Sequence, residues 1–178
     1  MKQLPKEIQA ILNTILNDKK DHKDISPRSK VRMGHLLTYV YDAKYKDKLP
    51  VWDELPLLVL LDIPDGKYIL GINLHYIPYT YRLQFLKYLQ TKNLKIQYRD
   101  IKAAWQKAKI PTAFAQLAIR KYLISHVRSK IKIFYDAEEQ YEIVKQILPR
   151  FHKQKMAQVY QNINLKMKKQ RQSLKDKA

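Results

Sequence analysis

Residues 55–77, LPLLVLLDIPDGKYILGINLHYI, hold the pattern that determines the fold. Two β-forming runs flank the Pro-Asp-Gly step at residues 64–66, which is typical of a tight turn because proline fixes φ early and glycine accepts a positive φ late. The pattern predicts a β-hairpin. Residues 57–61 are apolar at every position, which indicates a central strand, and Gly71 in the second strand indicates a bulge or a sharp bend.

A third β-forming run, HLLTYVY at residues 35–41, precedes the hairpin. All three glycines and four of the eight prolines lie within residues 33–79, so this part of the chain turns often. Short strands with frequent turns favour a small, strongly bent β-barrel or half-barrel of SH3-like type. We therefore expect a barrel-like core at residues 33–79.

Helical spacing of apolar residues dominates the rest of the chain. It predicts an amphipathic helix at residues 5–17. After the core we expect a helix at residues 81–91 capped by Thr80, a second from Asp100, and a third from Thr112 that continues past residue 124.

Towards the end of the chain, Asp136 and Glu139 have the spacing of a capping box and predict a further helix that ends before Pro149. A last helix is expected from about Arg150. The predicted class is α+β, with four segments: an N-terminal helix and linker at 1–32, the core at 33–79, a helical region at 80–164 and a basic, solvated tail at 165–178.

The charge is the strongest compositional signal. The 178 residues include 35 Lys and Arg against 16 Asp and Glu, a formal net charge of +19 at pH 7. Such a surface favours a polyanionic partner, with nucleic acid ahead of an anionic membrane or an acidic protein. Cysteine is absent from the sequence, which excludes disulfides, thiol nucleophiles and Cys-ligated metal centres. Apolar runs long enough to span a bilayer are absent too, and we expect no membrane partner.

The basic residues concentrate near the C-terminus. Ten Lys and Arg residues lie at residues 145–178 against one acid, Asp176. A basic helix with a trailing arm would neutralise several phosphates of double-stranded DNA and bind it without regard to sequence; the alternative is a solvated lysine-rich tail. The candidate DNA-binding residues are Arg120, Lys121, Arg128, Lys145, Arg150, Lys153, Lys155, Lys166, Lys168, Lys169 and Arg171.

Signals for enzymatic chemistry are weak. Asp53 followed by Asp65 and Lys67 matches the Asp…Asp-x-Lys pattern of metal-dependent nucleases. The match is weak, because Asp-x-Lys occurs five times in the chain and Asp65 is better explained by the turn. The five histidines show no metal-binding spacing. His75, expected late in a strand, fits a structural role better than a catalytic one. We expect no catalytic residue, no metal and no cofactor.

Four segments carry a family resemblance: residues 34–53 (GHLLTYVYDAKYKDKLPVWD), Pro56-Leu57, residues 70–78 (LGINLHYIP) and residues 122–129 (YLISHVRS). In this order they resemble a family of small proteins of tailed bacteriophages, especially T4-like phages of cyanobacteria. The similarity extends over roughly residues 33–160. Ala43 stands where the family usually has proline, Val51-Trp52 replaces paired tyrosines, and the C-terminal tail is longer and more basic.

The resemblance implies a DNA end protector or a related protein of phage heads and DNA termini. We therefore expect a non-enzymatic virion protein that contacts genomic DNA and other virion proteins, in the virion and, during assembly, in the host cytoplasm. A structural adaptor of the neck, tail or baseplate is the alternative. The motif residues are interpreted as structural or, less favoured, as a docking surface: Tyr41, Asp42, Lys44, Lys48, Pro50, Asp53, Pro56, Gly71, Asn73, His75 and Tyr76.

Overall fold

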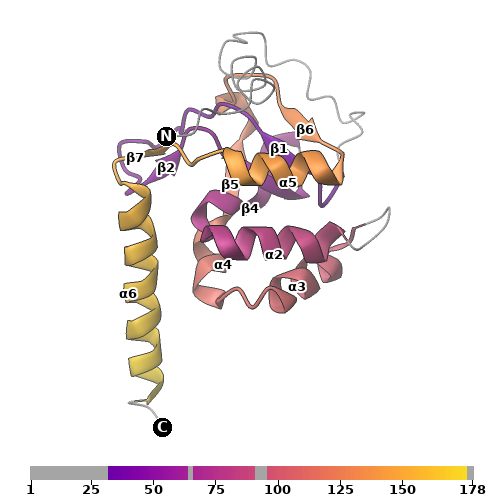
Figure 1. Cartoon of the computed structure of the whole chain (residues 1–178). Helices are drawn as coiled ribbons and strands as arrows, with labels where there is room; N and C mark the ends of the chain where they lie inside the picture. The colour runs from indigo at the N-terminus through magenta and orange to yellow at the C-terminus, as the bar shows by residue number, and fades with distance from the viewer. Residues whose placement is uncertain (1–31, 64–65, 91–95, 176–178) are drawn as a thin grey trace.

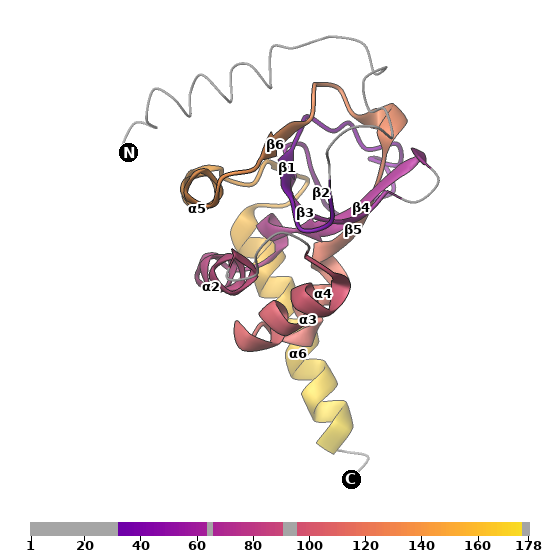
Figure 2. The same ribbon diagram turned by 90° about the vertical axis from the view of Figure 1, so that its right-hand side faces the viewer.

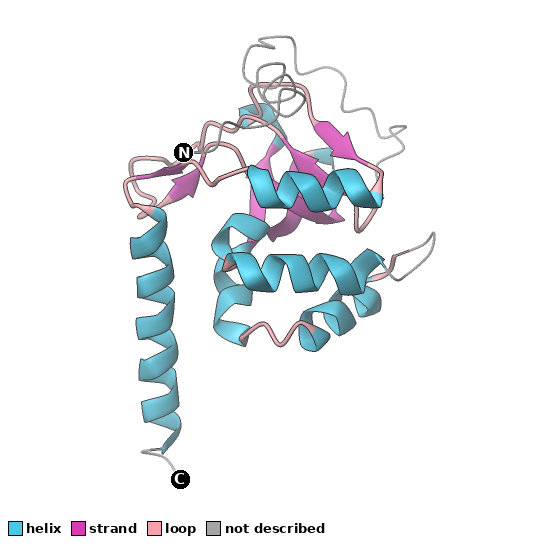
Figure 3. Cartoon of the chain, in the orientation of Figure 1, coloured by secondary structure: helices cyan, strands magenta, loops and turns pink. Residues whose placement is uncertain are grey.

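The computed structural model describes residues 32–63, 66–90 and 96–175 (Figure 1). Its centre is an antiparallel five-stranded sheet with the strand order β5-β4-β3-β1-β6. The strands are β1 (Leu36–Thr38), β3 (Leu57–Asp62), β4 (Tyr68–Asn73), β5 (Ile119–Leu123) and β6 (Lys132–Phe134). A separate two-stranded ribbon pairs β2 (Trp52–Asp53) with β7 (Phe151–His152) (Figure 3).

The described helices cover the sheet and extend from it. They are α2 (Tyr79–Gln90), α3 (Tyr98–Lys107), α4 (Thr112–Ala118), α5 (Ala137–Gln146) and α6 (Met156–Lys175). Figures 1 and 2 show α2, α3 and α4 gathered beside the sheet, whereas α6 runs from the ribbon and ends well outside the body. The α+β class is therefore confirmed. The expected helix at residues 5–17 lies outside the described residues.

The predicted hairpin is confirmed, with β3 and β4 paired in antiparallel register. β3 is central as expected, because both of its faces are covered. Leu57, Val59 and Leu61 pack in a core shared with the helices. Leu58 and Leu60 point the other way into a second core with Tyr39, Tyr41 and Tyr122. A strand covered on both faces shows no polar alternation, which explains its continuous apolar run.

The expected irregularity at Gly71 exists, but the extra residue lies on the partner strand. The register shifts between Leu60 and Asp62 of β3, opposite Gly71 and Leu70. A Cβ at Gly71 would lie 2.5 Å from Cγ of Leu58 and 2.8 Å from the carbonyl oxygen of Val59. Glycine is thus required by the close approach of β3.

Of the two predicted forms, the closed barrel is wrong for the described residues, whereas the SH3-like half-barrel stays a prediction. The strands form an open sheet with β5 and β6 at its edges, and Figure 2 shows this sheet bent rather than flat. Two of its five strands, β5 and β6, come from residues 80–164, where we expected helices. Short strands near a tight turn indicated a strongly bent sheet. Whether such a sheet closes into a barrel also depends on which distant strands pair, and the local sequence pattern carries no information on that pairing.

The third predicted helix is too long. α4 ends at Ala118, and the chain continues as β5 along the open side of β4. The apparent helical stripe combined residues that pack in different places: Phe114 lies in the helix-facing core, whereas Val127 lies in the second core. His75 likewise lies in a short 3₁₀ helix (Leu74–Tyr76) rather than in a strand, because Asn73 Oδ1 accepts from its backbone N–H at 3.0 Å.

The last two helices differ in how well their ends were predicted. Asp136 caps α5 and accepts from the N–H groups of Glu138 and Glu139, as its spacing predicted. α6 begins at Met156, after β7, rather than at Arg150, and it continues as a helix to Lys175. The segment expected as a solvated tail is therefore largely helical, while the division of the chain at residues 32, 79 and 164 stays a prediction.

Candidate nucleic-acid interface

The densest group of predicted DNA-binding residues lies on the projecting part of α6. Val159 and Ile163 bury the beginning of this helix in the core, and beyond them α6 leaves the body (Figures 1 and 2). Lys168 and Lys169 are exposed there, and Lys166 and Arg171 belong to the same turns. The sequence of α6 contains no Asp or Glu. The projecting helix is therefore a concentrated positive charge without internal compensation.

Two other predicted cations are paired with acids of the chain. Arg128 Nη2 lies 3.5 Å from Asp42 Oδ2, and Lys145 Nζ lies 2.6 Å from Glu142 Oε1. The hydrogen bond from Lys46 lowers the pKa of Asp42; burial opposes this effect, and the attraction of Lys46 and Arg128 adds to it. Arg128 and Lys145 are half exposed, so their charge is partly offset where they stand.

The two cations of β5 lie over aromatic rings. The guanidinium of Arg120 lies 4.6 Å from the ring centre of Tyr76, and Lys121 Nζ lies 4.1 Å from that of Tyr68. Burial, partly opposed by Arg120, raises the pKa of Tyr76 to about 12. These contacts hold both cations against the sheet. Both predicted cations of β5 are therefore engaged by rings of the body.

Three further cations surround the ribbon from which α6 starts. Arg150 and Lys155 are exposed. Lys153 has a positive φ of 68°, and its Nζ donates to the carbonyl oxygens of Asp47 at 2.8 Å and Leu49 at 3.0 Å. Lys153 thus ties the ribbon to the loop before β2, and the three cations form a second positive group at the beginning of α6.

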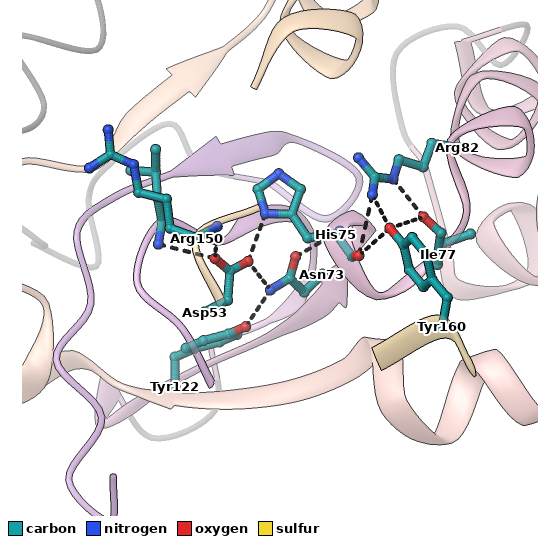
Figure 4. Close-up of polar contacts among 9 residues, drawn as sticks. Asp53, Asn73, His75, Ile77, Arg82, Tyr122, Arg150 and Tyr160 are labelled. Carbon is teal, nitrogen blue, oxygen red and sulfur yellow. Dashed lines mark hydrogen bonds and ion pairs between the residues drawn. The ribbon is translucent and has the colours of Figure 1, made fainter. Parts of the chain in front are cut away.

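The motif residues Asp53, Asn73 and His75 meet in a buried polar cluster (Figure 4). Asp53 Oδ2 accepts from His75 Nδ1 at 2.7 Å and from Asn73 Nδ2 at 3.0 Å, and that amide also lies 2.9 Å from the hydroxyl of Tyr122. Asp53 Oδ1 accepts from the backbone N–H groups of Leu55 and Arg150. A single carboxylate therefore links β2, β4 and the segment that leads to β7.

Electrostatics favour the charged form of this carboxylate. Burial would raise the pKa of Asp53, but the attraction of His75, with hydrogen bonds from His75, Asn73 and the Arg150 N–H, outweighs it and lowers the pKa below the usual range. The side chains of Asp53 and His75 are both 0% exposed. A buried charge is tolerated only when it is paired and hydrogen-bonded, as it is here.

A second set of polar contacts ties α6 to the body. The hydroxyl of Tyr160 donates to the carbonyl oxygen of His75 at 2.8 Å and accepts from the guanidinium of Arg82. Arg82, on α2, is buried, and its Nε donates to the carbonyl oxygen of Ile77 at 2.6 Å. The 3₁₀ helix that carries His75 is thus held from both sides, and α6 leaves the body at a defined position.

Replacing Tyr160 with phenylalanine is expected to lower the free energy of unfolding by about 1–2 kcal/mol. The substitution removes the hydroxyl that donates to the carbonyl oxygen of His75 and accepts from the guanidinium of Arg82, so both groups lose a partner. Urea unfolding measures the change. Tyr135→Phe is the control, since the Tyr135 side chain is exposed and should change stability by less than about 0.5 kcal/mol. Equal effects of the two substitutions would contradict this role of the hydroxyl.

The other motif residues divide between the interior and one loop. Tyr41, Pro56, Gly71 and Tyr76 are buried, and Tyr41 packs its ring on Tyr122. The remaining motif residues, Asp42, Lys44, Lys48 and Pro50, lie in the turn-rich segment between β1 and β2, where the last three are exposed. The family motif therefore consists of two parts, a set of buried packing residues and an exposed loop.

The nuclease interpretation finds no matching geometry. Asp53 directs both carboxylate oxygens to partners in the interior, away from solvent. Lys67 is exposed at the start of β4, and Asp65 lies outside the described residues. Within the described ranges, no group of three or more His, Asp or Glu side chains is placed to hold a metal ion. The same ranges contain no helix long and apolar enough to cross a membrane.

Sequence reasoning missed Arg82 and Tyr160 and assigned no role to Tyr122, although these three residues complete the polar contacts of the motif. One signal was available: Arg82 shares its helix face with the apolar Phe85, Leu86 and Leu89, and a charged residue on such a face indicates a buried partner. Trp52 and His152 were missed as well. Their contact joins residues 100 positions apart, which no local pattern reports.

One protein family matches this chain over most of its length. The model of the family described as "Phage T4 terminal DNA protecting protein" matches residues 6–168. Neither a curated protein nor a solved structure matches the chain. The matched region contains the buried polar cluster, the loop before β2 and α6 as far as Lys168. This match covers most of the chain and confirms the predicted resemblance, so the chain belongs to the Phage T4 terminal DNA protecting protein family.

Proposed function

We propose that this protein is a non-enzymatic virion component that binds the ends of phage genomic DNA, where it protects them or seats them in the head or neck. The observation that carries the proposal is the projecting part of α6. The sequence of this part contains Lys166, Lys168, Lys169, Arg171 and Lys175, and α6 contains no Asp or Glu. The family's description as DNA protecting supplies the class of ligand.

The physical basis is neutralisation of phosphates. Each lysine or arginine that contacts a phosphate releases condensed counterions, which provides affinity independent of base sequence. Lys168, Arg171 and Lys175 occupy positions i, i+3 and i+7 and so share one face of α6. A helix with a basic face fits the major groove or lies along the phosphate backbone.

The body of the protein gives this helix a fixed base. Val159 and Ile163 bury its first turns, and Tyr160 binds the carbonyl oxygen of His75. His75 is in turn held by Asp53, so the buried polar cluster supports the beginning of α6. A helix anchored in this way is already ordered when it meets DNA, which reduces the entropy lost on binding.

A structural adaptor of the neck, tail or baseplate is the second candidate. The exposed loop that carries Lys44, Lys48 and Pro50 favours it, because these motif residues have no packing role in the interior. Tyr45 in the same loop is 56% exposed. An exposed tyrosine among lysines suits a protein partner with acidic groups.

Protection of DNA ends tests the first candidate. Blunt linear duplex is incubated with the protein and then with a processive exonuclease, and we expect the saturated duplex to be digested at least tenfold more slowly. A nicked circle digested from its nick serves as the control for general coating of DNA. Unchanged digestion of the linear duplex at saturating protein would favour the adaptor. Cleavage of circular DNA by the protein alone in Mg²⁺ or Mn²⁺ would contradict the non-enzymatic assignment.

A further inference from the structure

Two aromatic rings face each other on the ribbon that precedes α6. Trp52 of β2 and His152 of β7 are paired in register, and their rings are stacked with centroids 4.2 Å apart and an interplanar angle of 8°. The His152 side chain remains 46% exposed although Trp52 covers one of its faces. Its Nε2 lies 3.2 Å from Glu54 Oε2, which fixes the orientation of the ring. We call these two rings the aromatic pair.

The charge around the aromatic pair suits a polyanion. Arg150 and Lys153 flank His152 in the chain, and Lys155 follows before α6 begins. Lys153 is fixed to the loop before β2 through Asp47 and Leu49. The carboxylate of Glu54 is engaged by the His152 ring. The flat aromatic surface therefore lies among cations that attract phosphates.

We propose that the aromatic pair stacks on the exposed face of the terminal base pair of a DNA duplex. The inference rests on the proposed function, and it assigns the recognition of an end to specific residues. Inside a duplex both faces of every base pair are covered by neighbours. A free face exists only at an end, so an aromatic surface that must stack on a base pair selects ends over interiors.

The position of the ribbon relative to α6 agrees with this assignment. β7 ends at His152, and α6 starts four residues later at Met156. A 20-residue helix is about 30 Å long, which corresponds to about nine base pairs of duplex. With the terminal base pair at the aromatic pair, the duplex would extend along the basic part of α6. Stacking by the aromatic pair would then select the DNA end, and the lysines of α6 would supply most of the affinity for the duplex.

The test compares a duplex with open blunt ends and the same duplex closed at both ends by hairpin loops. We expect the protein to bind the open duplex about tenfold more tightly, within the range of base–aromatic stacking. The double variant Trp52→Ala/His152→Ala should lose this preference and keep the affinity for the closed duplex. The matched control is Tyr98→Ala/Tyr135→Ala, which removes two exposed rings elsewhere and should keep the preference.

A fluorescent base makes the test independent of the variants. With 2-aminopurine as the last base of one strand, binding of the wild-type protein should quench its fluorescence, whereas the same base in the middle of the duplex should be unaffected. Trp52→Phe/His152→Phe retains two rings and should retain the preference for open ends. This aromatic variant, with the terminal probe, decides the question if the alanine variant fails to fold.

The outcomes separate the inference from the proposed function. An alanine variant that still prefers open ends, or a terminal probe that is not quenched, would overturn the stacking assignment while DNA binding stands. Equal binding of open and closed duplexes by the wild-type protein would overturn it as well. Failure of the wild-type protein to bind either duplex would instead contradict the proposed function.

Discussion

Replacing Asp53 with alanine is expected to lower the free energy of unfolding by about 3–5 kcal/mol. The substitution removes a carboxylate that accepts from His75, Asn73, Leu55 N–H and Arg150 N–H. It leaves three buried donors and one part-buried donor, the Arg150 N–H, without this acceptor. Unfolding in urea at pH 7, followed by circular dichroism, measures the loss. This should be among the largest effects of any single substitution in the chain.

The matched control is Asp47→Ala, which removes an exposed carboxylate from the loop before β2 and should change stability by less than about 0.5 kcal/mol. The loss at Asp53 should also depend on pH. Its folded pKa is lowered, so its stabilisation is present above the unfolded value of about 3.9 and is lost as the pH falls through the folded pKa. The difference between wild type and Asp53→Ala should therefore shrink below about pH 4. A difference that stays constant from pH 7 to pH 2 would contradict stabilisation by an ionised Asp53 carboxylate.

Replacing four cations of the projecting helix with glutamine is expected to weaken duplex binding by more than tenfold at 0.1 M salt. The variant carries Lys166→Gln, Lys168→Gln, Lys169→Gln and Arg171→Gln. The slope of log K against log salt should fall by about 0.9 for each phosphate contact that is lost. Fluorescence anisotropy of a labelled duplex across a salt titration gives both quantities. Stability should change little, because these residues follow the buried turns of α6.

The chain offers a control with the same change in charge. Arg99, Lys102, Lys107 and Lys109 lie on or just after α3 and are exposed, and their replacement by glutamine also removes three lysines and one arginine. If the location of the cations matters, this variant keeps most of the affinity and the salt slope. Equal losses in the two variants would show that net charge alone governs binding and would contradict a specific role for α6.

The sequence correctly predicted the elements that depend on residues close together in the chain. The turn at residues 64–66 and the apolar run after Pro56 specified the β3–β4 hairpin, because turn chemistry and burial on both faces are visible in a short window. Asp136 predicted the beginning of α5 for the same reason, since a cap acts within three residues.

The wrong or incomplete predictions concern features that depend on contacts between residues far apart in the chain. β5 was predicted as part of a helix from the apolar residues between Phe114 and Val127, although these two residues pack in different cores. Its strand conformation depends on pairing with β4, about 50 residues earlier. The candidate cations were found by composition, but their grouping was not. Asp42 and Glu142 offset Arg128 and Lys145, and the β5 cations lie over aromatic rings.

The sequence by itself determined the charge, the hairpin, the α+β class and the ordered motifs that mark the phage family, because each depends on composition or on neighbours in the chain. Only the tertiary structure decided that Asp53, Asn73 and His75 meet in the interior, and that Arg82 and Tyr160 hold α6 against them. It alone placed the ring of Trp52 on that of His152. The reason is physical: these groups are buried or stacked by partners up to 100 residues away, and folding, not spacing, brings them within bonding distance.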